Sequence, residues 1–442
     1  MKKLLRSLLF SGLGLVALTL VVFVGMKVAA KKQTAEMDAI ASEFLQQYPT
    51  VEQNASAKTL DNLSATLGLK SPSVEAIQDF PEPAESANFQ NVEDIVRDYF
   101  DAQKNKEQGP LDPIPAPVQT YLTDNQEVLS QIQTHLNSKA APVWRFDAAL
   151  YTDFESELPS YLGLIQLHKI LLLKAVNHAQ QNQQAQMVSA LEASHRLSVV
   201  TTQRLDLMSY LVTLIAVDDT VILMRHLDGI PPSLSEQLLT TDLQQLGVDG
   251  LKFENWTFYQ AMNHAMNDSA QANSLFDPVD SGLAVLPSII LGKPYLTLSS
   301  VNTARIREKS HAQMEGENIC SLDVEALDEA TIEEIPWWNM VGQIAIPAFS
   351  VQWRKGGDRM LTAELTHLIV QAKALAAEQG NWPETLPDLS SQTCPDEHWV
   401  YEVSPEGEMS LSFSREFYWR ANDDNVPSRH LPLTYRADLS YR

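Results

Sequence analysis

The feature that most constrains this chain is an apolar stretch near its amino terminus that carries no charged residue, Ser7–Met26. As a helix rising about 1.5 Å per residue, this stretch spans about 30 Å, which is the thickness of the hydrocarbon core of a bilayer. A buried helix of a globular protein rarely runs this long without a charge. The sequence therefore predicts a membrane helix within residues 1–32.

Retention and orientation of this helix follow from its flanks. Val28-Ala29-Ala30 has the small residues of a signal-peptide cleavage site, so cleavage after Ala30 stays open. The apolar stretch is longer than a signal core of about 7–15 residues, and lysines flank the cleavage point, which favours an uncleaved anchor. The two flanks carry similar positive charge, so the extra charge of the amino terminus and the greater frequency of N-in anchors favour a cytoplasmic amino terminus. We expect a single-pass inner-membrane protein whose bulk lies outside the cytoplasm, in a periplasm-like space.

Charge balance excludes one class of partner. The chain has 56 acidic and 32 basic residues, which gives a formal net charge of −24. Such a field repels phosphate backbones, so we expect no binding to nucleic acid.

Glycine is sparse, at 17 of 442 residues, which favours helices over turn-rich β architecture. The predicted fold class is therefore mainly α.

Hydrophobic periodicity divides the body into regions. Prolines punctuate residues 33–142, which read as a stalk or a loose helical layer. Residues 143–275 read as a helical domain, either a bundle or a short α-solenoid-like array. A capping box with Ser233 and Glu236 is expected to start its fourth helix. The five helices expected there are Leu158–Gln180, Gln184–Val200, Gln203–Leu227, Ser233–Leu246 and Asp249–Asn273.

The carboxyl-terminal third has a different pattern. Residues 276–335 are expected to be irregular and acidic, and a solvated surface loop is favoured over a cation site because the spacing fits no calcium loop. Residues 336–442 are expected to form a small α+β unit. In this unit a long helix, Arg359–Gln379, precedes a β-hairpin of His398–Val403 and Met409–Ser414.

A motif follows the long helix: Gly380-Asn381-Trp382-Pro383-Glu384-Thr385-Leu386. It resembles the G-x-[WY]-P-x-x-L segment of type II secretion pseudopilins and of uncharacterised membrane-anchored bacterial envelope proteins. The resemblance implies a pilin-like helix-plus-hairpin unit at the end of an anchored chain. No prepilin processing site is found, so pilus assembly is not implied. Gly380, Trp382, Pro383 and Leu386 are interpreted as a helix stop and a hydrophobic plug.

The chain has two cysteines, Cys320 and Cys394. In an oxidising compartment two unpaired thiols are uncommon, so we predict a disulfide between them. Two thiols without suitably spaced histidines cannot complete a zinc site, and no metal ligands or cofactor are predicted.

Buried charge is the most unusual feature of the helical domain. Asp206, Asp218 and Asp219 fall within an apolar helix, and Arg204, Arg225 and Arg196 are available as partners. A buried carboxylate requires a partner or a shifted pKa. Structural ion pairs are favoured over an acid–base dyad, and no catalytic residue is predicted.

Three classes of function are compatible with these features. The favoured one is a non-catalytic, membrane-anchored scaffold or assembly factor that binds another envelope protein. The alternatives are a binding module for a peptide or small ligand, and a hydrolase of unrecognised type. Because residues 143–275 form the largest helical array, we expect protein binding to lie there.

Overall fold

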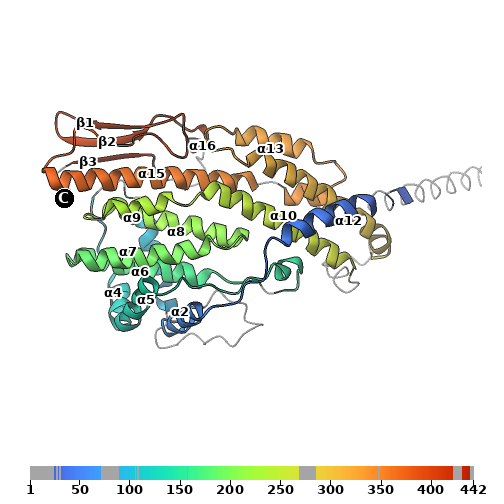
Figure 1. Ribbon diagram of the computed structural model, residues 1–442, viewed down its shortest axis with the longest axis horizontal. Coiled ribbons are helices and arrows are strands. Elements are labelled where there is room, and N and C mark those ends of the chain that lie inside the picture. The colour runs from blue at the N-terminus through green and yellow to red at the C-terminus, as the bar shows by residue number, and fades with distance from the viewer. Residues whose placement is uncertain are drawn as a thin grey trace, which may run out of the picture.

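The computed structural model describes residues 24–25, 28, 31–70, 89–104, 106, 109–156, 158–267, 285–346, 349–421 and 431–438. Within these ranges the fold is mainly α-helical, with one small antiparallel sheet near the carboxyl end (Figure 1). The mainly α class and a small carboxyl-terminal sheet unit are therefore confirmed. The predicted membrane helix over Ser7–Met26 falls almost entirely outside the described residues.

Helices follow one another along most of the chain. Residues 31–45 are helical. The next elements are α2 (Ala55–Thr66), η2 (Phe89–Asn91), α3 (Glu93–Lys104), α4 (Ala116–Asp124), α5 (Gln126–Ser138) and η3 (Ala148–Thr152). The central elements are α6 (Leu162–Gln180), α7 (Gln184–Thr201), α8 (Leu207–His226), α9 (Pro232–Glu236), η4 (Gln237–Leu239) and α10 (Leu243–Asn267). The last are α12 (Val285–Met314), α13 (Val324–Glu333), α14 (Met340–Ala345), α15 (Phe349–Gln379), β1 (Trp399–Val403), β2 (Glu408–Phe413), α16 (Tyr418–Ala421) and β3 (Thr434–Asp438).

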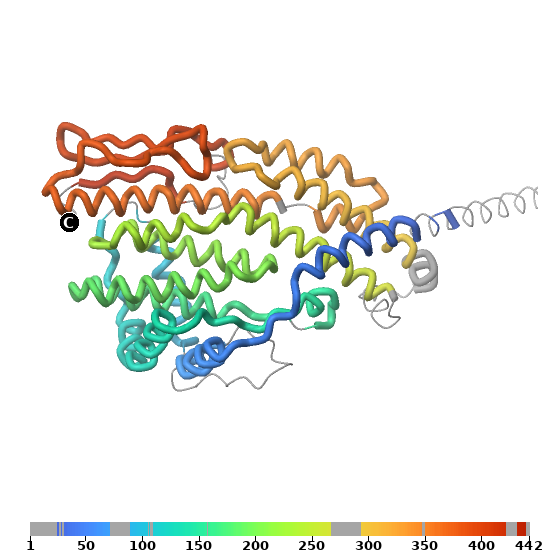
Figure 2. The backbone as a smooth tube through the Cα atoms, in the orientation of Figure 1, coloured from blue at the N-terminus to red at the C-terminus, as the bar shows by residue number. Residues whose placement is uncertain are grey.

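These elements lie in layers (Figures 1 and 2). The sheet covers one side of α15, and α8, α9 and α10 lie along its other side. Below them come α6 and α7, and then α2, α4 and α5. One large apolar cluster runs through these lower layers and reaches α15. The helix over residues 31–45 packs instead against α10 and α12.

The predicted stalk over residues 33–142 is wrong. Helices α2, α3 and α5 contribute fully buried side chains to the large apolar cluster, among them Leu60, Phe100 and Ile132. The prolines were misleading because Pro115 and Pro117 begin α4 and do not break it. Proline in the first turn of a helix removes no hydrogen bond. The alternative reading of a helical layer fits this region.

The predicted irregular segment over residues 276–335 is also wrong in its described part, because α12 and α13 occupy most of it. Two of its acidic side chains pair with bases from neighbouring helices. Lys252 Nζ lies 2.9 Å from a Glu315 oxygen, and Arg354 contacts Glu325. The acidic residues therefore lie largely on or beside helices, and two of them bind bases of α10 and α15.

In the predicted helical domain, α6, α7 and α8 confirm three of the expected helices. The next two divide differently, because α9 and η4 are short and α10 starts at Leu243, ahead of the predicted break. The capping box from Ser233 and Glu236 is absent, since Pro231 is the N-cap of α9 and no side chain caps it. A proline-fixed turn therefore starts this helix in place of a side-chain cap.

Among the described helices, α8 is long and apolar enough to cross a membrane by length and composition. However, 72% of the residues in its apolar window are buried inside the protein. It lies between α6, α7, α10 and α15. Its apolar character is therefore that of a core helix.

The carboxyl-terminal unit consists of α15 and an antiparallel sheet in the order β1-β2-β3. Trp399 pairs with Phe413 across β1 and β2, and Leu411 pairs with Tyr435 across β2 and β3. The predicted hairpin is confirmed, whereas β3 was not predicted. The helix α15 also starts at Phe349, well before the predicted start.

Candidate functional site

Asp206 was predicted to lie inside a helix, and it is instead the N-cap of α8. Its carboxylate accepts hydrogen bonds from the Ser209 amide at 2.9 Å, the Ser209 hydroxyl at 2.6 Å and the Tyr161 hydroxyl at 2.9 Å. Arg204 Nε lies 3.7 Å from the same carboxylate. A carboxylate at this position accepts hydrogen bonds from the free amides of the first turn and interacts favourably with the positive end of the helix dipole. Asp206 therefore has a structural role.

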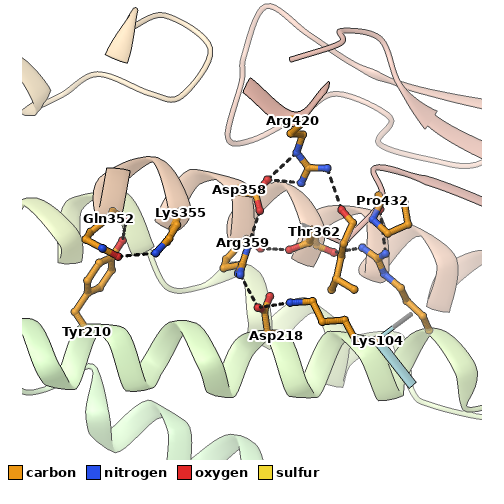
Figure 3. Close-up of polar contacts among 12 residues, drawn as sticks. Lys104, Tyr210, Asp218, Gln352, Lys355, Asp358, Arg359, Thr362, Arg420 and Pro432 are labelled. Atoms are coloured by element: carbon orange, nitrogen blue, oxygen red, sulfur yellow. Dashed lines mark hydrogen bonds and ion pairs between the residues drawn. The ribbon is translucent and has the colours of Figure 1, made fainter. Parts of the chain in front are cut away.

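Asp218 belongs to a buried row of charges, here called the charge chain: Lys104, Asp218, Arg359, Asp358 and Arg420. One Arg359 nitrogen lies 2.6 Å from Asp218, and another lies 2.6 Å from Asp358. Asp358 also accepts a hydrogen bond from Arg420 Nε at 2.8 Å, and Lys104 Nζ lies 3.8 Å from Asp218. Figure 3 shows the α15 neighbours Asp358 and Arg359 pointing to opposite sides. The chain therefore joins α3, α8, α15 and α16.

Two glycines allow α15 to come this close to its neighbours. A Cβ atom on Gly356 would lie 2.5 Å from the Tyr210 hydroxyl oxygen, which donates a hydrogen bond to Gln352 O at 2.9 Å (Figure 3). A Cβ atom on Gly357 would lie 2.7 Å from Ile319 Cβ. The two residues that follow are the aspartate and arginine of the charge chain. A Gly-Gly-Asp-Arg sequence inside a helix was thus the signal of this contact, and sequence analysis missed it.

Asp219, next to Asp218 on α8, has a weaker partner. Its carboxylate lies 3.8 Å from Lys169 Nζ of α6. Burial raises the pKa of Asp219 to about 7, against the opposing effect of Lys169. Burial also raises the pKa of Asp218, and Arg359 partly offsets this rise. An acid–base dyad requires a cleft that admits substrate, and neither carboxylate lines the two cavities described below.

Arg225 was considered an available partner for these aspartates, and it forms no ion pair with them among the described residues. Its guanidinium donates to three neutral oxygens: Thr366 Oγ1 at 3.0 Å, Pro432 O at 3.1 Å and Thr362 O at 3.1 Å. Burial lowers the pKa of Arg225 to about 10. Arg196 likewise donates to main-chain carbonyl oxygens of α5. The actual partner of Asp218 is Arg359, which sequence analysis missed.

Arg225 lines a cavity of about 510 Å³. The cavity lies where the carboxyl end of α8, the last turns of α15 and β3 meet. Its wall combines apolar side chains with charged ones: Pro110, Ala377, Trp382, Ala437, Arg225, His226, Asp228, Lys373, Arg436 and Asp438. A smaller cavity of about 230 Å³ opens on the other side of α15, beside Glu364 and His367. The larger cavity has the size of a small-molecule site.

The two cysteines lie beside the hydrogen-bonded carboxylate of Glu364. The Sγ atoms of Cys320 and Cys394 lie at bonding distance, with Cα atoms 5.7 Å apart. Glu364 of α15 holds the loop of Cys394 in place. Its carboxylate accepts hydrogen bonds from Thr393 N at 2.6 Å, Ser391 Oγ at 2.7 Å and Trp399 Nε1 at 3.0 Å.

The motif residues lie at the end of α15. Gly380 has a φ of +81° and follows the last helical residue. Trp382 and Leu386 are buried in the apolar cluster between α15 and the sheet. Tyr401 of β1 donates a hydrogen bond to Pro383 O at 2.7 Å. These positions tie the helix end to the hairpin.

Within the described ranges, His, Cys, Asp and Glu side chains form no group of three that could hold a metal ion. No protein-family model, curated protein or solved structure matches the chain. The resemblance to pseudopilins therefore stays a prediction.

Proposed function

We propose that the protein is a non-catalytic, membrane-anchored protein of the bacterial envelope that acts by binding another protein, as a scaffold or assembly factor. The apolar stretch Ser7–Met26 supports the anchor. The strong negative charge supports a protein partner over a nucleic acid.

The use of the buried carboxylates supports the non-catalytic proposal over a hydrolase. Asp206 caps a helix, Asp218 is bound by Arg359 at 2.6 Å, and Asp219 faces Lys169. Each of these groups lies at a contact between helices, and the bonds of Asp206 and Asp218 hold elements together. Buried ion pairs of this kind serve structure when no open cleft reaches them.

The observation that carries the proposal is an exposed apolar surface at the amino ends of α6 and α8. Leu158 is 53% exposed, Leu162 65% and Met208 55%. The buried hydrogen bond between Tyr161 and Asp206 holds these two helix ends together. Contiguous exposed apolar side chains mark protein-binding surfaces, and we take these three, which adjoin the Tyr161–Asp206 bond in the sequence, as such a surface. This surface, here called the α6–α8 surface, lies within the region 143–275 that sequence analysis favoured.

Two substitutions test this surface. We expect the double variant Leu162→Asp, Met208→Asp to lose the partner that co-purifies with the full chain after in-cell crosslinking. The matched control is Tyr418→Asp, because Tyr418 is 76% exposed on α16, outside this surface. Equal capture of the same partner by the double variant and by the control would refute the proposed surface.

The location is tested separately. A reporter that is active only in an oxidising compartment, fused after residue 442, should be active. Activity only from a reporter that requires the cytoplasm would refute the proposed topology.

A further inference from the structure

The cavity beside Arg225 has the charge of a ligand site. Arg225 is 5% exposed, and the three oxygens that accept its hydrogen bonds are all neutral. No carboxylate in the described part of the chain forms an ion pair with it. The nearby carboxylates Asp218 and Asp358 are already held by Arg359 and Arg420. A buried cation without a counter-charge is unfavourable, so the cavity favours an anion.

The second buried cation of the cavity differs in this respect. Lys373 Nζ lies 2.9 Å from Asp228 and donates to Arg225 O at 2.9 Å and Leu227 O at 3.2 Å. Its charge and its three N–H donors are therefore satisfied within the protein. Arg225 alone among the buried cations of this wall lacks a carboxylate partner.

The rest of the wall limits the ligand further. Pro110, Ala377, Trp382 and Ala437 give it an apolar part. Burial lowers the pKa of His226, whose Nδ1 lies 2.8 Å from Gly109 O, so the ring adds no charge at neutral pH. Asp228 is paired with Lys373, and the other carboxylate of the wall, Asp438, would repel a doubly charged group such as a phosphate more strongly than a single carboxylate.

We propose that this cavity binds an apolar molecule that carries one carboxylate, with the carboxylate on Arg225 and the apolar body against Trp382 and Ala377. Arginine suits a carboxylate because its guanidinium presents several N–H donors in one plane. A free organic acid and the terminal carboxylate of a peptide share this chemistry. The site is separate from the α6–α8 surface, and it adds ligand binding to the proposed protein binding.

The test uses 4-phenylbutyrate as the probe, measured by calorimetry and by saturation-transfer NMR on the full chain in detergent. For a probe of this size we expect a dissociation constant on the order of 1 mM. The neutral amide of the same acid should bind at least tenfold more weakly. Equal binding of acid and amide, or no binding of the acid, would overturn the proposal.

A variant that keeps Arg225 tests whether the probe binds inside this cavity. Ala377 lies on the cavity wall at an exposed position of α15, so Ala377→Phe should fill the cavity, leave the fold intact and weaken binding at least tenfold. Gln379→Phe, an exposed α15 position outside this wall, is the matched control and should bind normally. Binding of the acid that survives in Ala377→Phe lies elsewhere and contradicts the proposal.

The source of the carboxylate is distinguished with a tripeptide that ends in phenylalanine. If the free-acid peptide binds at least tenfold more tightly than both 4-phenylbutyrate and its own amidated form, the ligand is a peptide terminus. If the peptide binds no better than 4-phenylbutyrate, the ligand is a free organic acid. Both outcomes require the loss of binding in Ala377→Phe.

Discussion

Two interfaces of the molecule are built on different principles. Between α6 and α7 the contact is mainly aliphatic, with Leu167, Leu171 and Leu191 fully buried, and it holds one neutral polar pair, Ser194 Oγ and His168 Nδ1 at 2.8 Å. Between α8 and α15 the contact includes Asp218 and Arg359 at 2.6 Å, within a chain of buried charges. The first interface depends mostly on apolar faces of suitable volume, whereas the second needs each charge to meet its opposite.

The difference concerns specificity more than strength. A buried ion pair adds little net stability compared with an apolar pair, because both charges lose their hydration. Removing one partner is much worse, since the other charge stays buried and unpaired. We infer that the charge chain fixes how α15 and its sheet dock on the helical body. The aliphatic interface supplies the larger part of the stability.

The largest expected effect breaks the charged interface. Arg359→Met leaves Asp218 and Asp358 without their shared partner and should lower the free energy of unfolding by about 3–5 kcal/mol. Urea denaturation measures this. The control is Arg97→Met, because Arg97 pairs with Asp94 at 2.9 Å but is 58% exposed, and its loss should stay under about 1 kcal/mol. Similar losses in the two variants would contradict the distinction.

The next effect concerns the cysteines, which tie residues before α13 to the sheet unit. Closing a loop of 74 residues should stabilise the fold by about 4 kcal/mol in the chain-entropy model. The variant Cys320→Ala, Cys394→Ala should lose stability of this order, measured by urea denaturation without reductant. If both thiols of the unreduced wild-type protein react with an alkylating probe after denaturation, the disulfide does not form.

The third effect is a pH dependence at Asp219. Burial raises its pKa to about 7 in the folded state, whereas an unfolded aspartate titrates near 3.9. Between these values the folded state binds more protons, so this group lowers stability as the pH rises from about 4 to about 7. Asp219→Asn should match the wild type near pH 4 and exceed it at pH 8 by at most about 4 kcal/mol.

His168 sharpens this comparison because its effect has the opposite sign. Burial lowers its pKa to about 4, so the folded state binds fewer protons than the unfolded state, and this group lowers stability as the pH falls below about 6.5. The effect of Asp219 must therefore be read from the difference between variant and wild type. A difference that does not change with pH would contradict the assignment.

Local patterns predicted the helical layers well. The apolar faces of α6, α7 and α8 recur at helical spacing, and Gly380 marks the end of α15. The errors arose where one signal has two meanings. Proline begins α4 and does not break a helix, and the acidic stretch around α13 is helical, with Glu325 bound by Arg354 of α15. The strand β3 is five residues long and was missed although the turn-forming sequence Asn422–Ser428 precedes it.

The site was less predictable because its partners are distant in the sequence. The buried aspartates were recognised as unusual, and Arg204 was a correct partner for Asp206. The pairing of Asp218 with Arg359 depends on the packing of α15 against α8. The Gly-Gly-Asp-Arg sequence marks a close contact of α15, but it does not identify the helix or the carboxylate on the other side. The cavity beside Arg225 likewise exists only after α8, α15 and β3 meet.

The smallest expected effect on stability is at the α6–α8 surface. Leu162→Asp and Met208→Asp replace exposed side chains, so each should change the free energy of unfolding by less than about 0.5 kcal/mol. Thermal denaturation of the purified variants measures this. A larger loss would mean that these residues serve packing, and their effect on partner capture would then report unfolding.

The most direct test of the central claim places a photoreactive amino acid at single exposed positions in living cells. Position 162 lies on the α6–α8 surface, position 337 carries a tryptophan that is 86% exposed ahead of α14, and position 418 lies on α16. The account predicts that a specific partner is crosslinked from position 162 and from neither of the others. A partner captured from position 337 or 418 and not from 162 would contradict it.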